Sequence, residues 1–149
     1  MSIQFSTGLG LQLTLPDGAE RIAESSAGPL SAQFSLPGGE VVSAIRDDAA
    51  ASSLAGVIAW TQSMAGHYTA EYGAVEEMQG SIPAQDREGY AYSVCFTDAE
   101  QTPRRATLAG CLLPGGGFAG ITLLSINDGS PLDTALVQEI VHGIAPANP

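Results

Sequence analysis

The residues that could act as nucleophiles lie in settings that do not favour catalysis. The chain has many serines and two cysteines, Cys95 and Cys111, and none of them is part of a Gly-x-Ser-x-Gly turn or adjacent to a histidine. Both cysteines have apolar neighbours in segments expected to be strands, and such burial raises the pKa of a thiol and keeps it unreactive. We expect the two thiols to be free and buried, and out of register with each other.

Carboxylates are the next candidates, because two of them facing one pocket could act as general acid and base. The acidic residues that could pair in this way fall mostly in expected loops, where solvated acids are ordinary: Glu76, Glu77, Asp86, Glu88, Asp98 and Glu100. His67 and His142 are far apart in the sequence and suit the ends of helices, and no CxxC, HxxxH or HExxH spacing occurs. The sequence predicts no enzyme activity, no cofactor and no metal site.

A glycine-rich segment, PGGGFAG at residues 114–120, could suggest a phosphate-binding loop. Such a loop needs a helix after the glycines, so that backbone N–H groups at the helix start can face the anion. The segment that follows, FAGITLLSI, has the composition of a strand. The glycines therefore predict a hairpin turn.

Aromatic residues give the sharper hypothesis of a binding surface. Tyr90, Tyr92 and Phe96 alternate on one face of an expected strand, and Phe118 begins a later strand of the same sheet. If helices cover that face, these residues are core; if the face is open, they form a platform for a segment of a partner protein. We take Tyr90, Tyr92, Phe96 and Phe118 as the candidate partner-binding residues.

Composition and charge limit the classes of partner. The 149 residues include 16 acidic residues, five arginines and no lysine, which gives a net charge of -11. Such a charge disfavours nucleic acid and anionic lipid, and the basic pair Arg104-Arg105 is interpreted as a solvated turn. No apolar run is long enough to span a membrane, and residues 1–10 do not resemble a signal peptide. We expect a cytoplasmic protein.

Strands are expected in the first third of the chain. A row of alternating leucines precedes a turn at Pro16-Asp17-Gly18, namely Leu9, Leu11, Leu13 and Leu15. A short strand is expected at 21–26. Residues 30–36 alternate again, turn at 37–39 and return through 40–45, which predicts a hairpin.

The rest of the chain predicts a helix, a meander and a second helix. The first helix is expected at 49–66, capped by Asp47 or Asp48 and ended by Gly66, followed by a short strand at 74–78 and a bend at 80–83. Three strands are expected at 89–97, 105–113 and 118–126. Ser130 and Pro131 predict the start of the last helix, with Asp133 at its third position. This order predicts a single α+β domain over 1–149, with a mostly antiparallel sheet of about six strands and two helices.

The segments GLQLTLPDGAERIAES, GPLSAQFSLPGGEVVSAIRDD and EEMQGSIPAQDREGYAYSVCF, with the closing DTALVQEIVHGI, resemble the PsbP-like fold family of Mog, PsbP and DcrB-like proteins. The Leu-Pro of LPDGAERI and the GSIPA bend carry the resemblance, and Ala19 stands where many members have tryptophan. The likeness covers nearly the whole chain and is nearest in character to the Eag-type chaperones of secretion effectors.

The small size, the strong acidity and the lack of a catalytic constellation indicate a non-enzymatic binding protein, a cytoplasmic chaperone or adaptor. The resemblance to the Eag-type chaperones implies that its client is a segment of a secreted bacterial effector, bound on the sheet face of a homodimer. Two alternatives stay open: an immunity protein that neutralises a toxin through its acidic surface, and a carrier with a pocket for a small ligand between helix and sheet.

Overall fold

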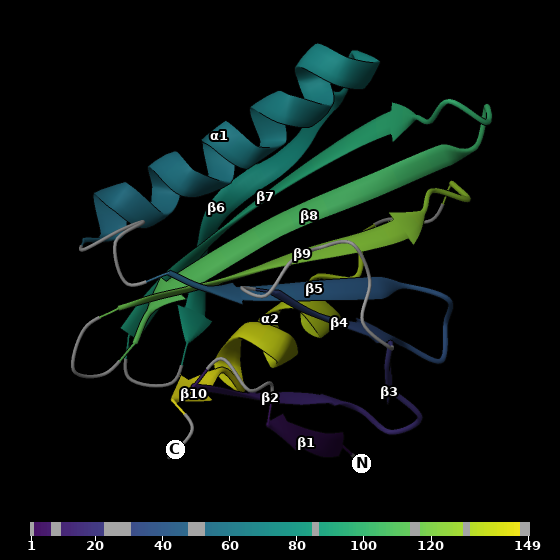
Figure 1. Cartoon of the computed structure of the whole chain (residues 1–149). Coiled ribbons are helices and arrows are strands. Elements are labelled where there is room, and N and C mark those ends of the chain that lie inside the picture. The colour runs from purple at the N-terminus through teal and green to yellow at the C-terminus, as the bar shows by residue number, and fades with distance from the viewer. Residues whose placement is uncertain are drawn as a thin grey trace.

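An antiparallel sheet of seven strands forms the centre of the computed structural model (Figure 1). The structure describes residues 2–6, 10–22, 31–47, 53–84, 87–113, 117–129 and 132–146. Within these residues the strands follow one another across the sheet in the order β3 (Glu20–Arg21), β4 (Ser31–Ser35), β5 (Val41–Arg46), β9 (Phe118–Ile126), β8 (Pro103–Leu112), β7 (Arg87–Thr97) and β6 (Val75–Ala84). With helices α1 (Leu54–Tyr72) and α2 (Thr134–His142), this confirms the α+β class.

A smaller sheet contains the first predicted strand. It joins β1 (Ser2–Ser6), β2 (Leu11–Pro16) and β10 (Ala145–Pro146), with β2 in the middle. Leu11, Leu13 and Leu15 form the buried row of β2, as the alternation predicts, while Leu9 lies outside the described residues. The alternation of leucines predicts a strand of the main sheet here, whereas β2 lies in the smaller sheet and pairs with β1, which the sequence does not predict.

The predicted hairpin and meander are confirmed. β4 pairs with β5, and β7, β8 and β9 are consecutive antiparallel neighbours. β9 spans the residues predicted for it. Residues 114–116 lie outside the description, but Leu113 N–H donates to Gly117 O (2.9 Å), so the glycine-rich segment joins two strands and no helix follows it.

The prediction of a short strand followed by a bend at Gly80–Pro83 was wrong. β6 continues through those residues to Ala84 and pairs along its length with β7. β6 is an edge strand, so Pro83 can lie in it without removing a hydrogen bond from an inner pair of strands.

The bounds predicted for the first helix were also wrong. Ser53 is the N-cap, and its side-chain oxygen accepts a hydrogen bond from Gly56 N–H (3.3 Å). Asp47 lies before the helix and Asp48 is outside the described residues. The helix continues past Gly66 to Gly73, whose left-handed backbone (φ 68°) provides the stop, so His67 lies within the helix.

The second helix begins three residues later than predicted. Asp133 is its N-cap, and the carboxylate accepts a hydrogen bond from Leu136 N–H (3.0 Å). Ser130 and Pro131, the predicted cap and first residue, lie outside the described residues. His142 occupies the last turn, as expected.

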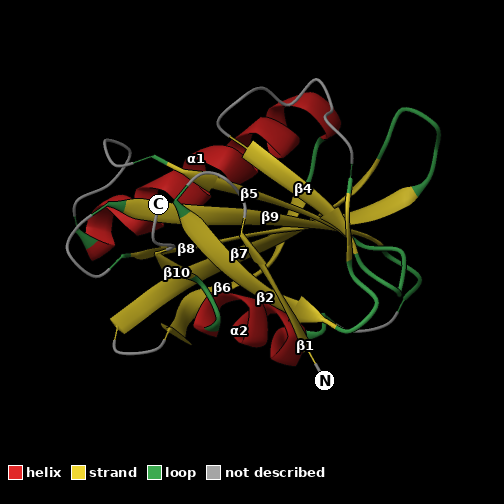
Figure 2. Ribbon diagram, turned by 60° about the horizontal axis from the view of Figure 1, so that its bottom comes forward, coloured by secondary structure: helices red, strands yellow, loops and turns green. Residues whose placement is uncertain are grey.

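The helices cover opposite faces of the main sheet (Figures 1 and 2). α1 packs on β7 and β8, and its Trp60 also contacts Phe118 at the start of β9. α2 and the smaller sheet pack on the other face and enclose the larger apolar cluster, in which Phe5 of β1 lies against Phe34 of β4. The cysteines are out of register, as expected, because Cys95 pairs with Arg105 and Cys111 with Gly89. Neither forms a disulfide; Cys111 is buried and Cys95 half-buried.

Candidate functional site

Two of the four candidate aromatic residues are buried beneath α1. Phe118 has no exposed surface, and its ring centroid lies 4.9 Å from that of Trp60. The ring of Phe96 stacks on Tyr72, with 4.9 Å between centroids. α1 therefore covers the face that carries these residues, which is the arrangement for which the sequence pattern predicts a core.

The other two candidates are half-buried on the same face and are held by side chains of β6. Tyr90 Oη donates to Gln79 Oε1 (2.6 Å), and Tyr92 Oη donates to Glu76 Oε1 (2.8 Å). The hydrogen bond to Glu76 and, to a smaller degree, burial raise the pKa of Tyr92. Partner binding by Tyr90, Tyr92, Phe96 and Phe118 stays a prediction.

The opposite face of β7 and β8 carries a group of polar side chains that we name the Arg105 cluster: Glu77, Ser93, Cys95, Arg105 and Thr107. Arg105 donates through Nε to Glu77 Oε1 (2.6 Å) and through Nη2 to Glu77 Oε2 (2.8 Å). Ser93 Oγ donates to the same Glu77 oxygen (3.0 Å) and lies 3.1 Å from Thr107 Oγ1. The cluster is a connected hydrogen-bond network across three strands.

A β-bulge places Glu77 in this cluster. The register of β6 and β7 shifts between Glu76 and Met78, which leaves Glu77 as the extra residue. A bulged residue can be aimed out of the regular alternation. Between Glu77 and Arg105, β7 carries only the small side chains of Ser93 and Cys95, so the two charged groups can meet across it.

The interpretation of Arg104-Arg105 as a solvated turn was wrong. Both residues lie in β8, because that strand begins at Pro103. Arg104 forms an ion pair with Asp98 (2.9 Å) near the start of the strand, and Arg105 is only 7% exposed. Glu77 lies in β6, within the strand expected at 74–78, and its carboxylate is the partner of Arg105.

The ion pair sets the protonation of the cluster. The hydrogen bond from Arg105 is the main reason why the pKa of Glu77 is lowered, and the hydrogen bond to Glu77 raises the pKa of Arg105. Burial, followed by the charge of Glu77, raises the pKa of Cys95. Cys95 thus stays a neutral thiol, as its sequence context predicts.

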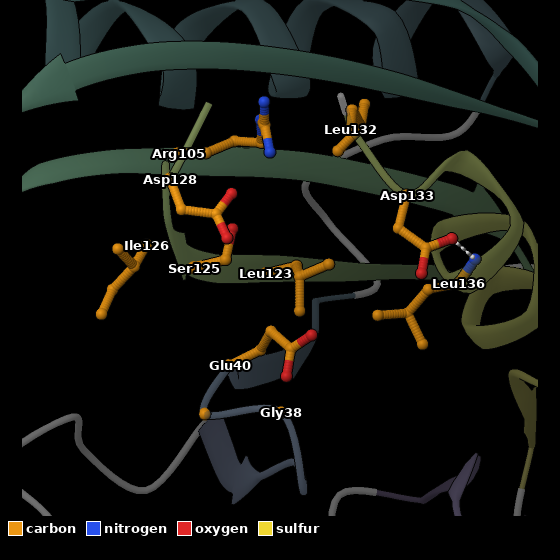
Figure 3. A pocket seen from close by; sticks show the side chains of 11 residues that line it. Gly38, Glu40, Arg105, Leu123, Ser125, Ile126, Asp128, Leu132, Asp133 and Leu136 are labelled. Atoms are coloured by element: carbon orange, nitrogen blue, oxygen red, sulfur yellow. Dashed lines mark hydrogen bonds between the residues drawn. The ribbon is translucent and has the colours of Figure 1, made fainter. Parts of the chain in front are cut away.

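A cleft with a volume of about 390 Å³ lies beside Arg105 (Figure 3). It is bounded by the β4–β5 turn, the ends of β8 and β9 and the start of α2. Four apolar side chains line it, namely Leu123, Ile126, Leu132 and Leu136, and three carboxylates do so as well, namely Glu40, Asp128 and Asp133. Arg105 of the Arg105 cluster also lines the cleft, together with Ser125, which pairs with it on β9.

Glu40 has an unusual environment within this cleft. Its Oε1 atom is buried, and within the described part of the chain this oxygen has no hydrogen-bond partner. Glu40 ends the β4–β5 turn, which is held by hydrogen bonds from Leu36 N–H to Glu40 O (2.8 Å) and from Gly39 N–H to Leu36 O (3.0 Å). A buried carboxylate oxygen without a donor is costly, so turning the Glu40 carboxylate toward a ligand that supplies a donor would be favoured here.

The walls of the cleft offer a ligand apolar contacts and carboxylate groups. Among the residues that the structure describes, no three or more His, Cys, Asp or Glu side chains are grouped so that they could hold a metal ion.

The sequence does not predict the cleft, because the residues that line it come from four separated segments. One signal was available. On the face opposite the aromatic residues, Ser93 and Thr107 are polar at positions where the pattern of β7 and β8 elsewhere places alanine or cysteine. Polar residues at buried positions of two adjacent strands indicate that these positions lie beyond the apolar core, in a region where hydrogen-bond partners are present.

Comparison with known proteins identifies the fold. No protein-family model matches the sequence, and no curated protein matches it either. The solution structure of cyanobacterial PsbP (CyanoP) from Synechocystis sp. PCC 6803 is similar with a TM-score of 0.65 and 11% identity, over 97% of this chain and 92% of that one. The protein Mog1 E65A mutant gives a TM-score of 0.69 and 10% identity, over 99% and 97% of the two chains. The chain therefore has the PsbP/Mog1-like fold that the sequence resemblance implied.

Neither helix resembles a transmembrane segment. In the part of the chain that the structure describes, no helix combines the length and the apolar character needed to cross a bilayer.

Proposed function

We propose that this protein is a non-catalytic binding protein that holds a segment of another protein in the cleft beside Arg105. The observation that carries this proposal is the lining of the cleft, where exposed apolar surface lies beside a buried and unsatisfied carboxylate oxygen. Ile126, at the rim, is 59% exposed and adds apolar surface to the mouth of the cleft.

Charge favours a protein partner over nucleic acid. The net charge of -11 would repel a phosphate backbone, and it would attract a partner with basic residues and speed its association. The likeness in fold to Mog1 and CyanoP is compatible with a binding role but does not specify the partner.

The finer proposal is a chaperone or adaptor in the bacterial cytoplasm whose client is a secreted effector. It is supported by the resemblance of the sequence to the Eag-type chaperones and by the acidic surface. In this proposal the protein acts as a homodimer, and the client binds on the sheet face opposite α1, where the cleft is open.

Co-expression with the products of the neighbouring genes tests the proposal. We expect one product to purify in a stoichiometric complex with the wild type and with Glu71→Gln, a control on the exposed surface of α1. Ile126→Glu should reduce the affinity about tenfold or more, because it places a charge in an apolar contact. Circular dichroism checks that the variants fold. Failure of every neighbouring product to bind, or equal binding by Ile126→Glu, would argue against the proposal.

The nature of the bound product separates the alternatives. A partner that is a toxin, and that loses its activity in the complex, would identify an immunity protein instead of a chaperone.

A small-ligand carrier is the second candidate, because a volume of about 390 Å³ is within the range of small-molecule sites. A thermal-shift screen of sugars, lipids and nucleotides tests it. A carrier should show a clear rise in melting temperature with one class of compound, and this rise should disappear in Ser125→Trp, which fills the cleft. No rise with any class would count against a carrier.

A further inference from the structure

We infer that the cleft recognises a basic side chain, arginine or lysine, that is next to an apolar residue in an extended segment of the partner protein. This inference rests on the proposed function and names the chemistry of the partner at that site. Glu40 is the residue that would receive the cation, while Leu123, Leu132 and Leu136 would contact its apolar neighbour.

The balance of charge in the cleft carries the first step. Three carboxylates line it, and the one cation that lines it, Arg105, is already in a bidentate ion pair with Glu77. Two of the carboxylates already interact within the protein: Asp133 accepts a hydrogen bond from Leu136 N–H and caps α2, and Asp128 also has a partner. The lining of the cleft thus carries three carboxylates against one guanidinium, so its net charge is negative.

The unsatisfied oxygen of Glu40 carries the second step. A carboxylate that has one oxygen buried without a donor would gain by turning that oxygen toward a ligand that brings N–H groups, and a cation brings them with opposite charge. Figure 3 shows the Glu40 side chain rising from the β4–β5 turn into the space below Leu123. A guanidinium or ammonium entering there would meet Glu40 while its aliphatic stem lies along leucine side chains, in the way that long basic side chains commonly pack.

The apolar wall selects a peptide over a free inorganic cation. Leu132 and Leu136 are partly buried and pack on the main core, so the wall is a fixed part of the fold. Ile126 extends this surface to the rim, where it is largely exposed. Charge and apolar surface in adjacent parts of one cleft fit a pair of adjacent residues in an extended chain, one basic and one apolar.

Titration of the full-length protein with two matched peptides tests the inference. The probe is N-acetyl-Leu-Arg-Leu-amide, and the control replaces arginine by citrulline, which has nearly the same shape and no charge. We expect the arginine peptide to shift the amide resonances of Gly39, Ser125 and Asp128 in NMR spectra, and the citrulline peptide to bind about tenfold more weakly or not at all.

Variants then assign the contact. Glu40→Gln, which conserves size, should weaken binding of the arginine peptide about tenfold, and Glu71→Gln should leave it unchanged. Equal binding of the two peptides, no binding of either, or unchanged binding by Glu40→Gln would overturn the inference. If a neighbouring gene product binds and Ile126→Glu disrupts it while Glu40→Gln does not, the proposed function stands and the recognition of a basic residue fails.

Discussion

Among the described residues, Arg105 is the one charged residue that is buried, and its environment makes the ion pair with Glu77 asymmetric. The side chain of Arg105 is 8% exposed and that of Glu77 is 26% exposed. If Arg105 is removed, water can reach Glu77. If Glu77 is removed, the guanidinium is left in a site that water reaches poorly, and an unpaired buried charge costs more than a partly exposed one.

Two substitutions should therefore differ in cost. We expect Glu77→Ala to reduce the free energy of unfolding by about 3 kcal/mol, the lower end for breaking a buried pair. Arg105→Met should cost about 1 kcal/mol, because its stem keeps much of the packing. The double variant should cost less than the sum of the two. Urea unfolding measures these values, and an equal cost for both single changes would contradict the asymmetry.

The same pair predicts how stability depends on pH. Because the pKa of Glu77 is lower in the folded protein than its ordinary value of 4.5, the unfolded chain binds its proton first on acidification. The contribution of Glu77 is thus fully present above pH 4.5 and is lost as the pH falls through its folded pKa. Unfolding of the wild type from pH 6 to pH 3 should show this loss, and Arg105→Met should show a smaller one. Parallel curves for the two proteins would show that the pair does not set the pKa.

At the scale of elements, the contact between α1 and the sheet depends on a missing side chain. A Cβ at Gly120 would lie 2.6 Å from Trp60 Cη2 and 2.9 Å from Trp60 Cζ2, so the indole occupies the space above that glycine. Gly120→Ala should lower the free energy of unfolding by about 1–3 kcal/mol, because it overpacks this contact. Trp60 fluorescence during urea unfolding reports on it directly.

Gly66→Ala is the matched control within the same pair of elements. A Cβ at Gly66 meets nothing within 4 Å, and the residue is exposed inside α1. This change should stabilise the protein by up to about 1 kcal/mol, because alanine is the better helix former. Destabilisation by Gly66→Ala, or tolerance of Gly120→Ala, would show that α1 does not pack as described.

The accuracy of prediction from the sequence also varies between elements for physical reasons. β9 is buried along most of its length between two neighbours, so its composition and turns define it. β6 is an exposed edge strand with a bulge, and neither feature gives a regular alternation. Residues that can cap a helix are common in this chain, and the sequence alone does not show which of them do so. Ser53 caps the start of α1 in place of Asp47, and the helix continues past Gly66, because of how it packs on the sheet.

The site was harder to predict than the fold because it depends on register. Nothing in the sequence places Glu77 across a strand from Arg105, since a bulge aims it there. The aromatic row was predicted correctly as one face, but which face a helix would cover follows from the tertiary arrangement. Glu40 and Leu136 meet at the cleft only once α2 has docked on the sheet.

At the scale of the whole molecule, repulsion between the many acidic side chains lowers the stability of the folded state. The net charge of -11 at pH 7 is spread over a small surface, and like charges repel one another more strongly in the compact state than in the unfolded chain. Salt screens such repulsion between exposed groups, with a Debye length of about 10 Å at 0.1 M. The partly buried pair of Arg105 and Glu77 is screened less, so repulsion between surface acids should dominate the response to salt.

We therefore expect the melting temperature at pH 7 to rise as sodium chloride increases from low to physiological concentration. Neutralising three exposed acids together, Glu71→Gln, Glu100→Gln and Glu139→Gln, should raise the melting temperature at low salt and flatten its dependence on salt. Choline chloride should act like sodium chloride, because screening depends on ionic strength and not on the cation. A response to sodium alone would indicate specific ion binding, and a fall in melting temperature with either salt would show that attractive pairs outweigh the repulsion.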